Sequence, residues 1–110
     1  MKRFIQDADR IFLACGTTDF RKQIPGLVAM VQIQFKLDPY MGSHVFLFCN
    51  KKKDGIKVLR YDQNGFVLAT KKLLDDMKFQ WPKTPNDVKE LSFQQDRVRS
   101  EERFSRNAET

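Results

Sequence analysis

Alternating apolar and polar positions in the middle of the chain predict three consecutive β-strands. Short polar segments separate the three runs, which cover residues 44–50, 56–62 and 66–72. The separating segments contain Asp54-Gly55 and Asn64-Gly65, which favour type I′ hairpin turns because both central residues of such a turn need positive φ. The pattern therefore predicts an antiparallel β-meander at the centre of the molecule.

An apolar run over residues 10–15 precedes the meander and predicts another strand, buried on both faces and bounded by Gly16. Pro25 suits the first turn of a helix, which we expect to continue to about Leu37, where Asp38-Pro39 stops it. The expected apolar side of this helix is formed by Leu27, Val28, Met30, Val31 and Phe35, with Ile33 as a further candidate.

The pattern weakens after Lys72. Residues 79–82 are compatible with a short edge strand ended by Pro82, and residues 88–91 with a short strand or the start of a helix. Taken together, the runs predict the α+β class. We expect three central antiparallel strands, an N-terminal strand and a candidate short C-terminal strand, all packed against one main helix.

The two hairpin dipeptides also predict which residues face each other. A two-residue loop at Asn64-Gly65 places Lys57 opposite Lys72, and one at Asp54-Gly55 places Lys52 opposite Lys57. The same sheet face then collects Phe46, Phe48, Leu59, Tyr61, Phe66 and Leu68. A longer, irregular loop at residues 51–55 would break the pairing of Lys52 with Lys57.

Further basic residues gather near this row of lysines. Lys51, Lys53 and Lys71 would project from the other face at the same end of the sheet, with Arg60 further in, beside Ala69. Such an end would neutralise phosphates with salt-dependent affinity and little dependence on base sequence. Lysine-rich hairpin tips also keep sheet ends soluble and block edge pairing, so both interpretations stay open.

The composition agrees with a basic surface on a single domain. The chain has 110 residues, a formal net charge of +6 and a pI near 9.5. A balance of this kind favours polyanionic partners such as nucleic acid, or an anionic membrane surface. A solvated surface that is merely basic is the alternative.

Metal and catalytic chemistry have little support in the sequence. Cys15 and Cys49 are the only cysteines and His44 is the only histidine, whereas a zinc site needs three or four such ligands. Both cysteines lie in apolar runs, where a buried thiol is more usual than a disulfide. The aspartates are spread over caps, turns and polar segments, unlike the clustered carboxylates of metal-dependent nucleases. We expect no enzyme activity, metal, cofactor or small-molecule substrate.

The sequence also gives no sign of a membrane segment. No apolar run approaches the roughly 18–20 residues that a transmembrane helix needs. Asp7 stands where a signal peptide would require an apolar stretch. The expected location is the cytoplasm.

Residues 99–110 resemble a translated sequencing adapter. A common adapter begins AGATCGGAAGAGC, and its translation in frame is Arg-Ser-Glu-Glu, the four residues that follow Val98. We therefore predict a single domain over residues 1–92, a truncated C-terminal segment over residues 93–98 and a non-native tail over residues 99–110. A genuine polar tail is the alternative.

Several segments, in the right order, resemble a known family. They are IFLACGTTDFRK at 11–22, DPY at 38–40, FLFCNKKKD at 46–54, IKVLRYD at 56–62, GFVL at 65–68, KKL at 71–73 and FQWP at 79–82. The family is the TnpB, or second-open-reading-frame, accessory protein of the bacterial insertion sequences numbered sixty-six. It is distinct from the RNA-guided nuclease that shares the name TnpB. The resemblance covers roughly residues 4–92.

The resemblance implies a protein encoded beside a DDE-type transposase and required for transposition. We expect that transposase as one partner and, from the basic residues, DNA as another. The candidate nucleic-acid-binding residues include the basic positions that match the family, which are Arg21, Lys22, Lys51, Lys52, Lys53, Lys57, Lys71 and Lys72. Arg60 is a further candidate. The competing hypothesis is an adaptor that docks on the transposase without contacting DNA. It would use the aromatic sheet face or the region of Trp81, a residue that would otherwise close the core.

Overall fold

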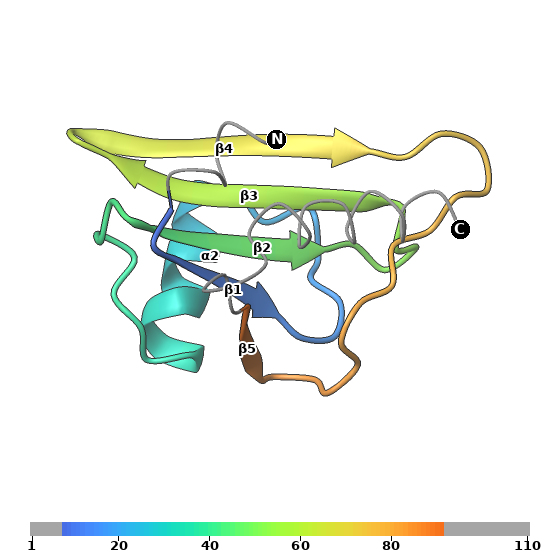
Figure 1. Ribbon diagram of the computed structural model, residues 1–110, viewed down its shortest axis with the longest axis horizontal. Helices are drawn as coiled ribbons and strands as arrows, with labels where there is room; N and C mark the ends of the chain where they lie inside the picture. The colour runs from blue at the N-terminus through green and yellow to red at the C-terminus, as the bar shows by residue number, and fades with distance from the viewer. Residues whose placement is uncertain (1–7, 92–110) are drawn as a thin grey trace.

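A computed structural model describes residues 8–91 as a five-stranded sheet with a helix behind it (Figure 1). The elements in chain order are β1 (Arg10–Ala14), α2 (Ile24–Ala29), the π-helical segment η1 (Met30–Gln34), β2 (His44–Cys49), β3 (Gly55–Asp62), β4 (Gly65–Lys72) and β5 (Val88–Leu91). The predicted α+β class is confirmed. The boundary expected after residue 92 and the tail expected at residues 99–110 lie outside the described residues.

The sheet has the strand order β4-β3-β2-β1-β5. The central meander is confirmed, because β2 pairs with β3 and β3 with β4 in antiparallel fashion. The N-terminal strand β1 runs parallel to β2 and antiparallel to β5, so it lies inside the sheet and is not at its edge. Residues 88–91 form the short C-terminal strand. The expected edge strand at residues 79–82 is wrong, since this segment has no regular structure.

The helical segment is shorter than expected and changes its hydrogen-bond pattern midway. It begins beside Pro25, as predicted, and its first hydrogen bond joins the Leu27 amide to the Gln23 carbonyl at 3.0 Å. The predicted end at Leu37 is wrong, because regular helix stops at Gln34 and Lys36 adopts a left-handed conformation with a φ of 56°. The Leu37 amide still donates to the Val31 carbonyl.

The sheet has an apolar core on each face. Behind the sheet, the helical segment packs Leu27 and Val31 against buried side chains of alternate strand positions, namely Phe12, Phe46, Phe48 and Leu59. The predicted aromatic face is therefore largely covered by the helix. Ile33, the further candidate for the apolar side of that helix, is instead 75% exposed.

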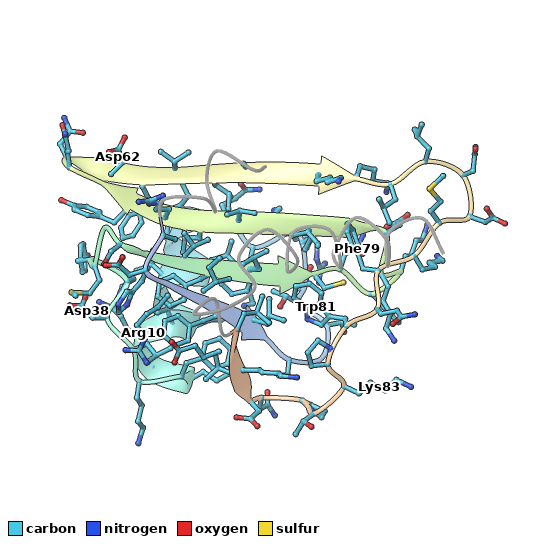
Figure 2. All side chains as sticks on the ribbon, in the orientation of Figure 1. Arg10, Asp38, Asp62, Phe79, Trp81 and Lys83 are labelled. Carbon is cyan, nitrogen blue, oxygen red and sulfur yellow. The ribbon has the colours of Figure 1, made fainter. Side chains whose placement is uncertain are left out.

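The front face of the sheet buries the other alternate positions, which are Ile11, Leu13, Val45, Leu47, Cys49, Ile56 and Val58. Phe79 and Trp81, from the segment that follows β4, belong to the same cluster. Figure 2 shows both side chains on this near face. β1 and β2 are buried on both sides of the sheet. The prediction that the apolar run of β1 is a strand buried on both faces is therefore confirmed.

Candidate nucleic-acid interface

The observed register separates the lysines that the hairpin dipeptides were expected to align. Lys57 lies opposite Thr70 on β4 and opposite Phe48 on β2, so its predicted pairings with Lys72 and Lys52 are wrong. Lys72 faces Gly55, and Lys52 lies in the loop between β2 and β3. The longer loop considered as the alternative is the one that forms.

Backbone conformation explains both errors of register. Positive φ falls on Lys53 (62°) and Gln63 (54°), one residue before each expected dipeptide. The β3–β4 loop therefore consists of Gln63 and Asn64, closed by the pair of Asp62 with Gly65. A register error of two or four residues leaves every side chain on the same face, because the pleat has a period of two.

Asn50 organises the loop between β2 and β3. Its Oδ1 accepts hydrogen bonds from the backbone amides of Asp54 and Gly55, each at 3.0 Å. Its Nδ2 donates to Asp54 Oδ1 at 2.6 Å. A Cβ on Gly55 would lie 3.0 Å from Asn50 Nδ2 and 3.1 Å from the Phe20 ring, so a larger residue would have to displace both side chains. This asparagine fixes a loop that keeps Lys51 and Lys52 exposed.

Lys57 is a buried lysine, with 8% of its surface exposed. Its Nζ donates to the Phe20 carbonyl at 2.8 Å and the Lys22 carbonyl at 3.1 Å, and it lies 4.9 Å from the centroid of the Phe20 ring. These contacts satisfy the amine inside the fold. Lys57 therefore holds the segment after β1 against β3, and its amine does not face the surface.

The segment that Lys57 holds carries Arg21. Asp19 accepts hydrogen bonds from the Arg21 backbone amide at 2.9 Å and from the guanidinium through Nε and Nη2. Hydrogen bonding from the Arg21 side chain lowers the pKa of Asp19 to about 2. The arginine side chain itself stays 91% exposed. The turn thus fixes the base of Arg21 and presents its charge outward.

These loops and the end of β4 enclose a shallow surface depression, the basic hollow, of about 560 Å³. Its lining residues are Thr17, Thr18, Asp19, Phe20, Arg21, Asn50, Lys51, Lys52 and Lys72. The hollow lies where β2 ends and β3 begins, at the right-hand side of Figure 1, called here the basic end. Four of the predicted basic residues therefore converge: Arg21, Lys51, Lys52 and Lys72.

Acidic groups near the basic hollow are already engaged by protein partners. Asp19 pairs with Arg21 at 2.7 Å, and Asp54 Oδ2 lies 3.4 Å from the Lys72 amine. Hydrogen bonding from Asn50, and then from Lys72, lowers the pKa of Asp54. Lys51 and Lys52 are exposed, and they carry the charge that these acids leave uncompensated.

The remaining predicted basic residues lie outside the lining of the hollow. Lys22 is exposed and lines a smaller adjoining depression of about 230 Å³, while Lys71 faces Ile56 across the ladder. Lys53 is half-buried in the loop. Arg60 lies opposite Val67, not beside Ala69, and its Nε donates to the Gly42 carbonyl at 2.7 Å near the other end of the sheet.

Sequence reasoning missed the polar groups of the hollow. The local pattern indicates only turn or strand-end residues at Thr17, Thr18 and Asn50, yet all three line it. Thr18 is buried, and its backbone amide donates to the Cys49 carbonyl at 2.7 Å, which fixes this turn against the end of β2. Only the high density of turn-forming residues after Gly16 hints at such a role in the sequence.

Trp81, the predicted partner-binding residue, lies inside the protein. It is 6% exposed, belongs to the front-face cluster and donates from Nε1 to the Ala14 carbonyl at 2.8 Å. A buried indole needs such an acceptor. The structure thus places Trp81 where the core interpretation expected it.

The opposite end of the sheet, the tyrosine end, is built from aromatic rings. The ring of Phe66 lies 5.3 Å from that of Tyr40 and 5.1 Å from that of Tyr61. Tyr40 is 53% exposed and Met41 is 43% exposed. Asp62, at the tip of the β3–β4 hairpin, marks this end in Figure 2.

Other reactive side chains do not gather into a site within residues 8–91. Cys15 and Cys49 are buried, unpaired thiols, and burial raises the pKa of both, that of Cys49 to about 11. No group of three metal-ligating side chains occurs among the described residues. In the same part of the chain, no helix is long and apolar enough to cross a membrane.

The fold and the basic hollow define a small α+β protein with a preformed cationic surface. The sequence profile of the family described as "IS66 Orf2 like protein" matches residues 9–101, most of the chain. The chain therefore belongs to this family of insertion-sequence accessory proteins, and the resemblance noted in the sequence is confirmed. Family membership implies association with the IS66 transposase system.

Two relatives come from Sinorhizobium fredii (strain NBRC 101917 / NGR234). The uncharacterized protein y4jC is 35% identical over 83 residues, which cover 76% of this chain and 69% of that protein. The uncharacterized protein y4hO is 38% identical over 73 residues, which cover 66% of this chain and 62% of that protein. No solved structure matches the chain.

Proposed function

We propose that this insertion-sequence accessory protein binds DNA phosphates through the basic hollow and is required alongside the transposase for transposition in the cytoplasm. The observation that carries the proposal is the convergence of Arg21, Lys51, Lys52 and Lys72 from separate segments of the chain. Family membership supplies the setting, since transposition acts on DNA.

The chemistry of the hollow suits a phosphate diester. Arginine and lysine donate charge-assisted hydrogen bonds to phosphate oxygens, and threonine hydroxyls and asparagine amides add neutral donors. Thr17 supplies such a hydroxyl within the same lining, whereas the Asn50 side chain is engaged by Asp54 and Gly55. A shallow, open hollow accepts a backbone and does not enclose a base, so we expect little dependence on base sequence.

The decisive experiment compares two double variants that remove equal charge. Lys51→Ala with Lys52→Ala removes two exposed lysines of the hollow, whereas Lys83→Ala with Lys89→Ala removes two exposed lysines elsewhere. Binding to short duplex DNA is measured by fluorescence anisotropy over a range of salt concentrations. The first variant should bind far more weakly, and its salt slope should fall by roughly 0.9 for each phosphate that it no longer neutralises.

The control double variant should bind DNA nearly as tightly as the unmodified protein. An equal reduction of affinity in both variants would mean that net charge alone attracts DNA and that the hollow has no special role. Absence of DNA affinity at low salt in the unmodified protein would overturn the proposal outright.

A second candidate function is an adaptor that docks on the transposase without contacting DNA. Exposed Tyr40 and Met41, beside the packed rings of the tyrosine end, favour it. Pull-down of the transposase of the same element should then survive high salt and fail for Tyr40→Ser with Met41→Ser. Ile33→Ser, which removes a similarly exposed apolar side chain elsewhere, is the matched control.

A further inference from the structure

The outer edge of β4 lacks a strand partner among residues 8–91. β4 is the terminal strand of the sheet and pairs with β3 along all eight of its residues. In an edge strand, alternate residues direct their backbone N–H and C=O groups away from the sheet. β4 therefore offers a long, regular row of hydrogen-bonding groups.

The two edges of the sheet differ in how they are protected. β5 is only four residues long, and its exposed Lys89 and Glu90 discourage pairing, with Glu90 also held by Arg10 at 2.6 Å. β4 is twice as long, has no proline, and is apolar and half-buried on both faces from Phe66 to Ala69. Only its last two residues, Lys71 and Lys72, carry charge.

We propose that β4 pairs with β4 of a second copy of this chain, in antiparallel orientation, to form one continuous sheet across a two-fold axis. A parallel arrangement would place Lys71 and Lys72 beside the same residues of the other copy, and like charges directly opposite each other are destabilising. The antiparallel arrangement moves these lysines toward the other copy's hairpin tip, where Asp62 is exposed. It is also self-complementary, so the assembly closes as a dimer.

The register of the hairpin identifies which amides would bond across the dimer. In a two-residue hairpin the residues that close the loop exchange hydrogen bonds, here Asp62 and Gly65. The alternation then directs the amides of Phe66, Leu68 and Thr70 outward. Thr70 is exposed, so its backbone can be altered with the least disturbance of the core.

Sedimentation equilibrium of the full chain, without DNA, tests the proposal. The unmodified protein should be a dimer that dissociates on dilution. Thr70→Pro removes an outward amide and should give a monomer, whereas Thr70→Val keeps that amide and should remain dimeric. Circular dichroism checks that the proline variant is folded. A folded proline variant that is still a dimer, or an unmodified protein that is monomeric throughout, would overturn the proposal.

Cysteine cross-linking provides a second measurement that does not depend on the proline variant folding. Ala69→Cys and Leu68→Cys each place a thiol near the proposed two-fold axis, and the native cysteines are buried. Mild oxidation should link at least one of these variants into a covalent dimer. The variant that cross-links identifies the register of the two β4 strands. A control variant, Lys83→Cys, should give no rapid cross-link. Failure of both β4 variants to cross-link would refute the pairing, whatever the outcome for DNA binding.

Discussion

The basic end and the tyrosine end of the same sheet are stabilised by different physical interactions. At the basic end, Asn50 and Lys57 satisfy backbone groups within the fold, and charged side chains remain at the surface. At the tyrosine end, the rings of Tyr40 and Phe66 each pack edge to face against the ring of Tyr61. The exposed charges of the basic end thus depend on the less exposed polar side chains of Asn50 and Lys57. Lys57, the buried lysine, contributes by holding the segment that carries Arg21.

The strongest test of this comparison removes the scaffold of the basic end. Lys57→Met keeps the length of the side chain but leaves the Phe20 and Lys22 carbonyls without their donor. We expect the free energy of unfolding to fall by about 2 kcal/mol, because two partly buried carbonyls lose a charged hydrogen-bond donor. Urea unfolding measures it. Lys71→Met, at an exposed position of β4, should change stability by less than about 0.5 kcal/mol. Equal stability of the two variants would contradict the scaffold role.

Removing a ring from the tyrosine end should have a smaller effect on stability. Phe66→Ala deletes a half-buried ring that contacts Tyr40 and Tyr61, and should lower the free energy of unfolding by about 1 kcal/mol. DNA affinity should be unchanged, since this ring lies at the end of β4 away from the hollow. Urea unfolding and anisotropy on one preparation measure both quantities. A large decrease in DNA affinity would show that the two ends are coupled.

The smallest expected effect is a dependence of stability on pH at the start of β2. Burial, and then the charge of Arg10, lower the pKa of His44 below its ordinary value of 6.5. Its buried Nδ1 has no hydrogen-bond partner among the described residues. The unfolded chain therefore binds the proton more readily, and stability should fall as the pH drops below about 6.5.

Thermal unfolding of the protein between neutral and mildly acidic pH measures this dependence. His44→Phe removes the titrating group and should show a flatter profile over the same range. A profile with the same slope in both proteins would assign the pH effect to other groups.

The sequence predicted the strands and their faces better than the contacts between them. Alternation and turn residues located β2, β3 and β4 closely, and errors of an even number of residues left each face unchanged. The dipeptides misled because turn propensity is local, whereas Asn50 imposes a longer loop through bonds to Asp54 and Gly55. Tertiary context decided the register.

The candidate site could be predicted only in part from the sequence, because tertiary contacts also decide which of its residues meet. Lys51 and Lys52 stand in an obvious polar loop, but nothing local shows that Lys57 meets carbonyls some 35 residues earlier in the chain. The convergence of Arg21 with Lys72 likewise depends on the position of β1 beside β2. Non-local contacts of this kind are absent from any local pattern.

The place of β1 between β2 and β5 has a consequence for how the protein is made. Pairing of Phe12 with Glu90 joins residues near the two ends of the described chain. A ribosome releases the chain from its N-terminus, so one side of β1 stays without its partner β5 until residues 88–91 have emerged. The β1–β5 pairing therefore cannot form before β5 is synthesised, and contacts between residues so distant in the sequence form slowly. Nascent chains halted before Val88 should consequently be the species most dependent on chaperones.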